Sequence, residues 1–363
     1  MRRFWKAVLP VFLVLSLLSG SALAEAPKEE LNGTEQVEES EKAEAQESEN
    51  ALTAANRQSP IFPMGTVADD FTEDRESMLL YLPSHFHRLT YTDRESGYYI
   101  HYNLFLPEKY DPKGSYPLVV FLNDSYACGT ELSIPLLRGI GPLVWASAAW
   151  QSVNPTIVAV PLYREPIVDE QSRYQSEYVG VTRRFIDLIC RNYAVDKSRI
   201  YGTGQGMGSS VVMLLASDHP DLFAACMFVG GRWSTKPLTR LESQKFIYFS
   251  SESDRYSHRM GENLLDQLSV DGARYAHSLW DGNWTAEERT TAALKMSTSS
   301  SGHYFICWLK DSIETSSDDL KRAQNDETDA LRVATYNKAY DCVAMMEWLF
   351  QQTKTVEEAA KTE

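Results

Sequence analysis

Short apolar runs alternate with amphipathic stretches through the middle of the chain. Residues 118–122 and 156–160 are continuously apolar, as expected of strands buried on both faces of a sheet. Residues 98–106 alternate between polar and apolar side chains, which predicts an antiparallel strand that ends at Pro107. Between residues 177 and 193, apolar side chains recur at helical spacing, so a helix is expected there.

The same alternation continues toward the C-terminus. The further predicted strands are residues 200–202, 226–229, 246–249 and 274–279, and the further predicted helices are residues 207–217, 260–268 and 337–351. Because strands alternate with helices, the pattern predicts an α/β fold with one doubly wound, mostly parallel sheet and helices on both faces.

The first 24 residues have the layout of a signal peptide. Basic residues precede an apolar run over 7–18, and small side chains around Ala22 and Ala24 form a cleavage site. The apolar run is shorter than the roughly 20 residues that a membrane-spanning helix needs. We therefore expect export, a secreted or extracytoplasmic location, and no membrane span after cleavage.

Composition changes sharply after the signal peptide. Residues 25–58 are rich in Glu, Ala, Ser and Gln and hold almost no large apolar side chain, which predicts a disordered acidic linker. The alternating pattern then predicts a single domain over residues 59–353, followed by a disordered tail over 354–363.

The formal net charge of −15 argues against nucleic acid and anionic membranes as partners. The five cysteines are odd in number and show no short paired spacing, so at least one is expected to be a free, buried thiol. Neither the cysteines nor the seven histidines are spaced like a metal site. No metal or cofactor is expected.

A glycine-rich turn lies between the strand at 200–202 and the helix at 207–217. Its glycines fall at every second position, which does not fit a dinucleotide fingerprint, and no lysine follows as a phosphate loop requires. Gly204, Gly206 and Gly208 instead fit the nucleophile elbow Gly-x-Ser-x-Gly, with glycine in place of the serine.

With this turn, the chain resembles the secreted α/β-hydrolase esterases of the polyhydroxybutyrate-depolymerase, feruloyl-esterase and predicted-peptidase group, over about residues 89–352. The matching stretches are residues 102–107 (YNLFLP), 116–121 (YPLVVF), 141–146 (GPLVWA), 150–151 (WQ), 193–207 and 347–350 (EWLF). Their order and spacing together carry the resemblance.

The resemblance implies a degenerate catalytic triad. Gly206 stands where the family has its nucleophilic serine, and Arg332 stands where the family has its histidine base. Asp254, after the strand at 246–249, is the implied acid. Glycine cannot form an acyl intermediate, and arginine cannot act as a general base. An ion pair between Arg332 and Asp254 is expected in place of the usual contact between histidine and carboxylate.

The resemblance also implies an oxyanion hole. It would use the backbone N–H of Met207 and the loop at Asn123, Asp124 and Ser125, where Asn123 replaces a family histidine. With Gln205 beside the elbow, these residues form the predicted ligand-binding set.

Two functions follow from these residues. The first is a pseudoenzyme that keeps an esterase-like cleft to bind a small-molecule ester, peptide or glycan-derived ligand, and a purely structural or partner-binding role cannot be separated from it. The second is a working serine esterase or peptidase-like hydrolase with displaced residues. Its candidates are Ser209 as nucleophile and His303, His85, His87 or His101 as base. If only two side chains are wrong, Gly206→Ser combined with Arg332→His is expected to restore ester hydrolysis.

Overall fold

The computed structural model describes residues 75–299 and 301–355. The predicted signal peptide and acidic linker lie outside these residues, as do residues 356–363 of the predicted tail. All described residues belong to one compact unit, Ser59–Glu363.

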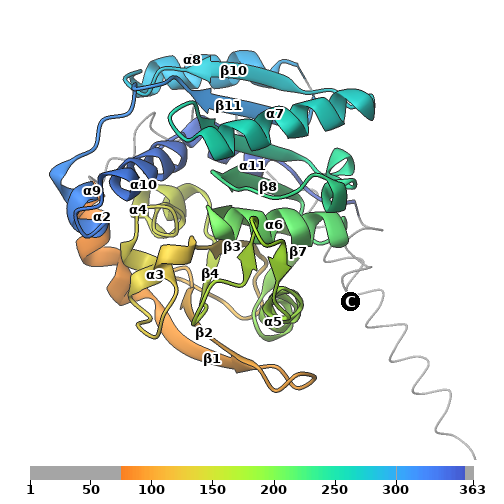
Figure 1. The fold of residues 1–363 in the computed structure, drawn as a ribbon. Helices are drawn as coiled ribbons and strands as arrows, with labels where there is room; N and C mark the ends of the chain where they lie inside the picture. Colours follow the sequence, from red (N-terminus) through yellow and green to blue (C-terminus); the bar gives the residue numbers. More distant parts are fainter. Residues whose placement is uncertain (1–74, 300, 356–363) are drawn as a thin grey trace, which may run out of the picture. The chain divides into compact units, whose positions relative to one another are not determined.

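A nine-stranded sheet forms the centre of the described part of the chain (Figure 1). In order across the sheet, its strands are β1 (His87–Thr92), β2 (Tyr99–Phe105), β4 (Ile157–Leu162), β3 (Tyr116–Leu122), β7 (Val195–Gln205), β8 (Ala225–Val229), β9 (Phe246–Ser251), β11 (His303–Trp308) and β10 (Ala276–Trp280). Strand β2 is antiparallel to both of its neighbours, whereas all other pairs are parallel. Two short strands, β5 (Val168–Asp169) and β6 (Tyr174–Gln175), pair separately.

Helices cover both faces of the sheet. One face packs against α5 (Tyr178–Asn192), α6 (Met207–Asp218) and α7 (Arg255–Val270). The other packs against α3 (Ile134–Leu137), α4 (Ala148–Val153), α8 (Ala286–Ser297), α10 (Glu327–Tyr340) and α11 (Val343–Phe350). The remaining α-helices described are α2 (Arg75–Tyr81) and α9 (Ser317–Arg322), and the 3-10 turns are η1 (Leu82–His85), η2 (Ser125–Ala127), η3 (Val144–Ala146), η4 (Lys236–Leu238) and η5 (Leu241–Ser243).

The continuous apolar runs follow from this two-sided burial. In β3, Leu118 and Val120 face the core beneath α5 and α6, while Val119 and Phe121 face the core beneath α10 and α11. Successive side chains of a strand point to opposite faces, so a strand that is covered on both must be apolar throughout. The predicted α/β fold with a mostly parallel sheet is confirmed.

The C-terminal end differs from the prediction. The single helix expected over 337–351 is wrong, because α10 ends at Tyr340 and α11 begins at Val343. Asp341 caps the end of α10, and its carboxylate accepts a hydrogen bond from Arg289 of α8 at 2.9 Å. This fixes the break between the two helices. Strands β1 and β11 and helix α8 were also not predicted.

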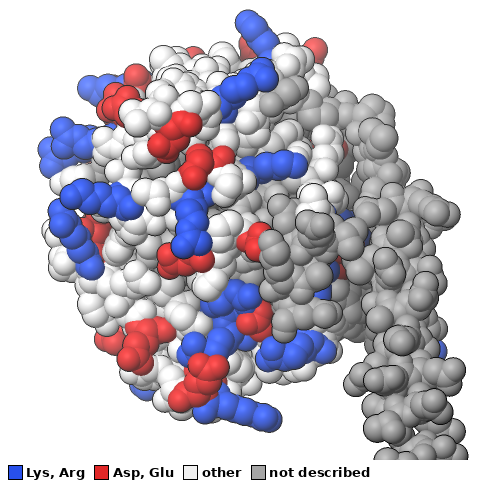
Figure 2. Space-filling model, turned by 90° about the vertical axis from the view of Figure 1, so that its right-hand side faces the viewer, with Lys and Arg blue, Asp and Glu red and all other residues white. Residues whose placement is uncertain are grey.

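All five cysteines are free thiols, and four of them are buried. None of the described helices is both long enough and apolar enough to cross a bilayer. Figure 2 shows acidic and basic side chains interspersed on one face of the molecule, so the described part of that face has no continuous field of one sign.

Candidate active site

The turn between β7 and α6 has the geometry of a nucleophile elbow. Gly206 caps the N-terminus of α6 with φ 52° and ψ −119°, a conformation that glycine adopts without a steric penalty. Its N–H donates to the carbonyl oxygen of Val229 at 2.9 Å. A Cβ at Gly208 would lie 2.0 Å from the carbonyl oxygen of Leu122, so the helix reaches this close to β3 only with glycine there.

Tyr336 occupies the space where a nucleophile would project. A Cβ built on Gly206 would lie 2.8 Å from Tyr336 Oη and 3.0 Å from Asp124 Cβ. The Tyr336 ring also lies over the backbone after β8, because a Cβ on Gly230 would lie 2.7 Å from its Cε1 atom. The elbow therefore keeps its backbone shape, but a tyrosine of α10 fills its active position.

Tyr336 brings a phenol hydroxyl to this position. Burial, together with the nearby Asp124, raises the pKa of its phenol well above the usual value. The protonated hydroxyl is therefore the form present at neutral pH. Its charged surroundings also include Arg332, Asp254 and Arg232, which places these three side chains around the same end of the sheet.

A buried ion-pair network lies beside Tyr336. Arg138 bridges two carboxylates: its Nε donates to Asp124 Oδ2 at 3.2 Å, and its Nη2 pairs with Asp329 of α10. All three side chains are at most 5% exposed. Burial raises the pKa of Asp124, and the Arg138 cation acts against that shift. Asp124, predicted to bind a ligand, is thus engaged in an internal ion pair.

The predicted pairing of Arg332 with Asp254 is wrong. Arg332 lies inside α10, and its Nη1 donates to Asp329 Oδ1 at 3.2 Å, one helical turn earlier. Its guanidinium lies over the Tyr126 ring at 5.5 Å. Asp254 instead caps α7, where it accepts the backbone N–H of Tyr256 at 3.1 Å. The reason is that position 332 is part of a helix and is not in a loop that could carry it to the acid.

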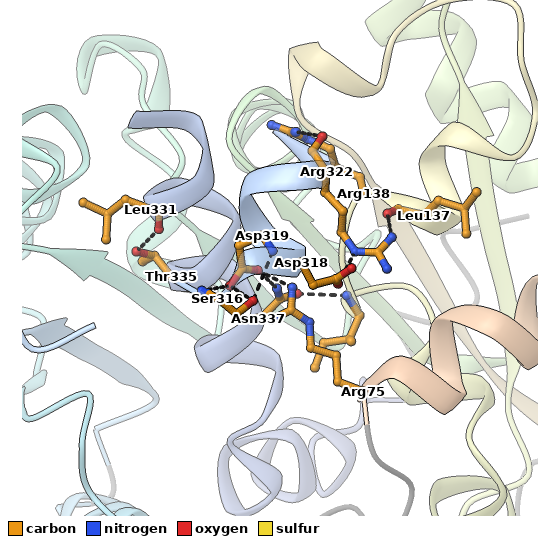
Figure 3. A network of polar contacts seen from close by, with 11 residues as sticks. Arg75, Leu137, Arg138, Ser316, Asp318, Asp319, Arg322, Leu331, Thr335 and Asn337 are labelled. Atoms are coloured by element: carbon orange, nitrogen blue, oxygen red, sulfur yellow. Dashed lines mark hydrogen bonds and ion pairs between the residues drawn. The ribbon is translucent and has the colours of Figure 1, made fainter. Parts of the chain in front are cut away.

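Interactions around Asp319 hold α10 in place (Figure 3). In Figure 3, Arg75 of α2, Ser316 before α9 and Asn337 of α10 all point toward the Asp319 carboxylate. Asn337 Oδ1 also accepts the N–H of Ile140 at 2.9 Å. Since Asn337 directly follows Tyr336, these contacts also fix the position of the Tyr336 side chain at the elbow.

The remaining predicted ligand-binding residues divide into two groups. Asn123 and Gln205 are buried: Asn123 Nδ2 donates to the carbonyl oxygen of Pro135 at 2.9 Å, and Gln205 Nε2 donates to Asn123 Oδ1 at 3.4 Å. They hold the loop after β3 against the elbow. Ser125 and Met207 are half-buried, and Met207 begins α6, so no helical carbonyl precedes its N–H as a partner.

The displaced pair proposed from sequence is not assembled. Ser209 is fully buried, and a Cβ built on Gly231 would lie 2.3 Å from its Oγ atom. His303 is the first residue of β11, so it lies at the amino edge of the sheet, whereas Ser209 follows the carboxyl end of β7. His303 Nδ1 bonds the carbonyl oxygen of Arg274 at 2.8 Å.

The three histidines from the first part of the domain also have other roles. His101 Nδ1 lies 2.8 Å from Thr90 Oγ1 across the β1–β2 pair, and His85 Nδ1 lies 3.1 Å from the carbonyl oxygen of Tyr81. His87 begins β1 with its side chain exposed.

A different nucleophile and base do lie together. Cys307 Sγ, near the carboxyl end of β11, is 3.4 Å from His258 Nδ1, and His258 Nε2 is 3.6 Å from Glu262 Oε1. Burial raises the pKa of the Cys307 thiol, which is only 2% exposed. Sequence reasoning missed this group because Cys307 lies on β11, far in the sequence from His258 and Glu262 of α7.

Tyr336, Arg138 and Asp329 were also missed. The signal for Tyr336 was present, because it follows Arg332 by one helical turn and so shares its helix face. However, the shared helix face could have been recognised only if residues 327–340 had been predicted to form a helix. Within the two described ranges, no group of three or more His, Cys, Asp and Glu side chains is arranged to hold a metal ion.

No protein-family model matches the sequence, and no curated protein matches it either. Among solved structures, the chain is similar to a thermostable esterase, with a TM-score of 0.57 and 22% identity over 75% of this chain. The match covers 64% of that esterase, so the chain spans less than two thirds of its length.

Weaker likenesses include two other hydrolases. A feruloyl esterase module from Clostridium thermocellum has a TM-score of 0.48 and 14% identity, covering 73% of this chain and 93% of that one. An S-formylglutathione hydrolase from Staphylococcus aureus has a TM-score of 0.42 and 10% identity, covering 68% and 98%. The parallel sheet, the elbow after β7 and the likeness to the thermostable esterase together identify an α/β-hydrolase fold.

Proposed function

We propose that this chain is an exported, non-catalytic α/β-hydrolase-fold protein that binds a ligand and does not hydrolyse it. The observation that carries this proposal is the elbow: position 206 is glycine, and Tyr336 Oη would lie 2.8 Å from any Cβ there. Export rests on the N-terminal sequence alone.

The residues at the elbow lack the nucleophile and the base that a serine hydrolase mechanism needs. Gly206 has no atom that could attack a carbonyl. Tyr336, which stands in its place, is a protonated phenol. Arg332 remains a cation: burial alone would lower its pKa, but nearby Tyr336 and Asp329 help to raise it. Acyl transfer therefore has neither a nucleophile nor a base at this site.

The donors that remain favour a ligand that carries a carbonyl or carboxylate group. The N–H of Met207 lies at the N-terminus of α6, where the helix dipole favours negative charge. Arg332 and Arg232 are partly exposed near Tyr336 and lie over the rings of Tyr126 and Tyr256 at 5.5 and 5.1 Å. A small ester, a peptide end or a glycan-derived acid has the matching acceptors.

An esterase assay on the purified full chain tests the proposal. We expect no hydrolysis of p-nitrophenyl acetate or butyrate above the rate in buffer, while butyrate binds and raises the melting temperature. Arg332→Met is the matched variant for binding, because it keeps a long side chain and removes the cation. It should reduce the rise in melting temperature that butyrate causes. Turnover by the unmodified chain would contradict the proposal.

One observation favours a second candidate, a cysteine hydrolase built on Cys307 with His258 as base. The Sγ to Nδ1 distance of 3.4 Å is within reach of proton transfer. Burial acts against it, since it raises the thiol pKa and excludes substrate. If hydrolysis is detected, Cys307→Ala should abolish it, while Cys342→Ala, at another buried cysteine, should not.

A further inference from the structure

A cavity among the described residues lies away from the elbow. It has a volume of about 620 Å³ and opens among the residues that precede β9 and β11 and those that end α8 and α11. Its lining includes Gln244, His303, Tyr304, Ser297, Trp348 and Gln351. Since β7, β8, β9 and β11 are parallel, this is the amino edge of the sheet, opposite to Gly206. The volume is in the range of small-molecule sites.

One lining side chain has an acceptor without a partner. Gln244 is 3% exposed, and its Oε1 atom has no hydrogen-bond partner among the described residues. Its orientation is fixed, because Nε2 donates to the carbonyl oxygens of Phe223 and Lys245, both at 3.3 Å. A buried acceptor without a donor is rare in folded proteins and needs an explanation. A donor brought by a ligand in the cavity provides one.

A second acceptor follows from the tautomer of His303. A carbonyl oxygen can only accept, so the 2.8 Å contact with Arg274 requires the proton on His303 Nδ1. In the neutral imidazole, Nε2 is then the acceptor. Two buried lining residues thus offer acceptors, and Gln244 Oε1 is the one that has no partner among the described residues.

The rest of the lining is polar but close to neutral. Ser297 and Gln351 add hydroxyl and amide groups, and the rings of Tyr304 and Trp348 meet edge to face at 4.8 Å. The ionised lining side chains, Glu242 and Lys245, are exposed and of opposite sign. Such a site suits a ligand with many hydroxyl groups and an apolar face, and it does not select for charge.

We propose that this amino-edge cavity binds a neutral sugar unit, whose hydroxyls donate to Gln244 and His303. The proposal does not depend on the elbow, because the two sites lie at opposite edges of the sheet. If one of the two proposals is contradicted by experiment, the other is therefore unaffected.

The test is isothermal titration of the full chain with glucose, galactose, xylose and N-acetylglucosamine, with citrate and spermidine as charged comparisons. We expect at least one sugar to bind and neither charged compound to do so. Gln244→Met keeps the side-chain length and removes the acceptor together with the Nε2 donor, so the sugar affinity should fall about tenfold. Gln267→Met, at a half-buried glutamine of α7 outside the cavity lining, is the matched control and should leave the affinity unchanged.

Gln351→Trp provides a second route, because it places bulk at an exposed position of the cavity rim and carries little risk to folding. It should abolish sugar binding while the melting temperature stays the same. The proposal is overturned if none of the four sugars binds, if citrate or spermidine binds in the cavity instead, or if Gln244→Met and Gln351→Trp both bind sugar as the unmodified chain does.

Discussion

At the carboxyl edge of the sheet, Tyr336 fills the turn after β7, and the ion pairs of Arg138 are buried beside it. At the amino edge, the residues before β9 and β11 leave a cavity of about 620 Å³ and an acceptor without a partner at Gln244. In α/β folds with a parallel sheet, ligands bind at the carboxyl ends of the strands. In this chain the buried ionised groups at that edge pair with one another, whereas this cavity lies at the opposite edge.

An elbow backbone can thus be kept without its site. The elbow keeps its strand, its positive φ and its helix, yet Tyr336 and Asp124 occupy the space into which a nucleophile at position 206 would project. Fold likeness therefore supports no activity by itself.

The largest effect is expected at Arg138. Replacing it by alanine leaves the carboxylates of Asp124 and Asp329 buried without their cation, which should lower the free energy of unfolding by about 3–5 kcal/mol. Urea unfolding measures this loss. Arg183→Ala removes a half-exposed pair with Asp187 on α5 and should cost about 0.5 kcal/mol or less. Equal losses would mean that the network at the elbow edge is not specially buried.

A Cβ at position 206 should be the next most costly change. Gly206→Ala incurs the strain of a positive φ, about 1–3 kcal/mol, and the contact with Tyr336 Oη in addition. Gly272→Ala is the control, because φ is +70° there and nothing lies within 4 Å of the added Cβ. Thermal unfolding measures the loss of stability in each variant, and the difference between the two losses estimates the cost of the contact with Tyr336 Oη.

The same contact can be removed from its other side. In a Tyr336→Phe background, the cost of Gly206→Ala should fall toward that of Gly272→Ala, since the nearest atom is gone. A cost that does not change would show that Tyr336 does not fill the elbow.

A smaller, pH-dependent effect is expected at Asp319. Burial alone would raise the pKa of Asp319, but hydrogen bonds from Arg75 and Ser316 lower it overall. The resulting stability is present above the unfolded pKa of about 3.9 and is lost as the pH falls through the lower folded value. Asp319→Asn should thus destabilise the chain at neutral pH, and the difference from the unmodified chain should shrink in acid. Chemical unfolding at several pH values checks this, and a difference that grows in acid would contradict it.

Changes at the rim of the amino-edge cavity should matter least for stability. Gln351→Ala removes an exposed side chain and should change the free energy of unfolding by no more than about 0.5 kcal/mol. A larger loss in urea unfolding would mean that this edge is packed as tightly as the other.

The combined change Gly206→Ser and Arg332→His should produce no gain in ester hydrolysis. Sequence reasoning alone predicts restoration, but Tyr336 occupies the position of the serine hydroxyl, and position 332 faces Asp329 from within α10. Initial rates with p-nitrophenyl acetate decide between the two expectations. Activity in the double variant would mean that Tyr336 moves aside easily.

The fold could be predicted because its signals are local. The two-sided burial of β3 and β4 requires continuous apolar runs, and the glycines at 206 and 208 are needed by the turn itself. The absence of a nucleophilic serine could also be predicted from the sequence, because it depends on the identity of one residue, Gly206.

The filling of the site could not be predicted in the same way. Tyr336 and Arg138 come from segments far apart in the sequence, and they lie near the same residue, Asp124, only in the folded chain. The misplaced start of the last helix put Arg332 in a loop and hid the helix face that it shares with Tyr336. The cavity, likewise, is formed by four separate segments, none of which has a pattern of its own.

The central claim is that no side chain of this protein acts as a nucleophile at the elbow. Intact-protein mass spectrometry of the full chain after incubation with a fluorophosphonate tests it most directly, because this reagent adds covalently to activated serine hydroxyls. The unmodified chain should keep its mass unchanged under conditions in which a control serine esterase is fully labelled. A single stoichiometric adduct on a residue next to Gly206 would contradict the account.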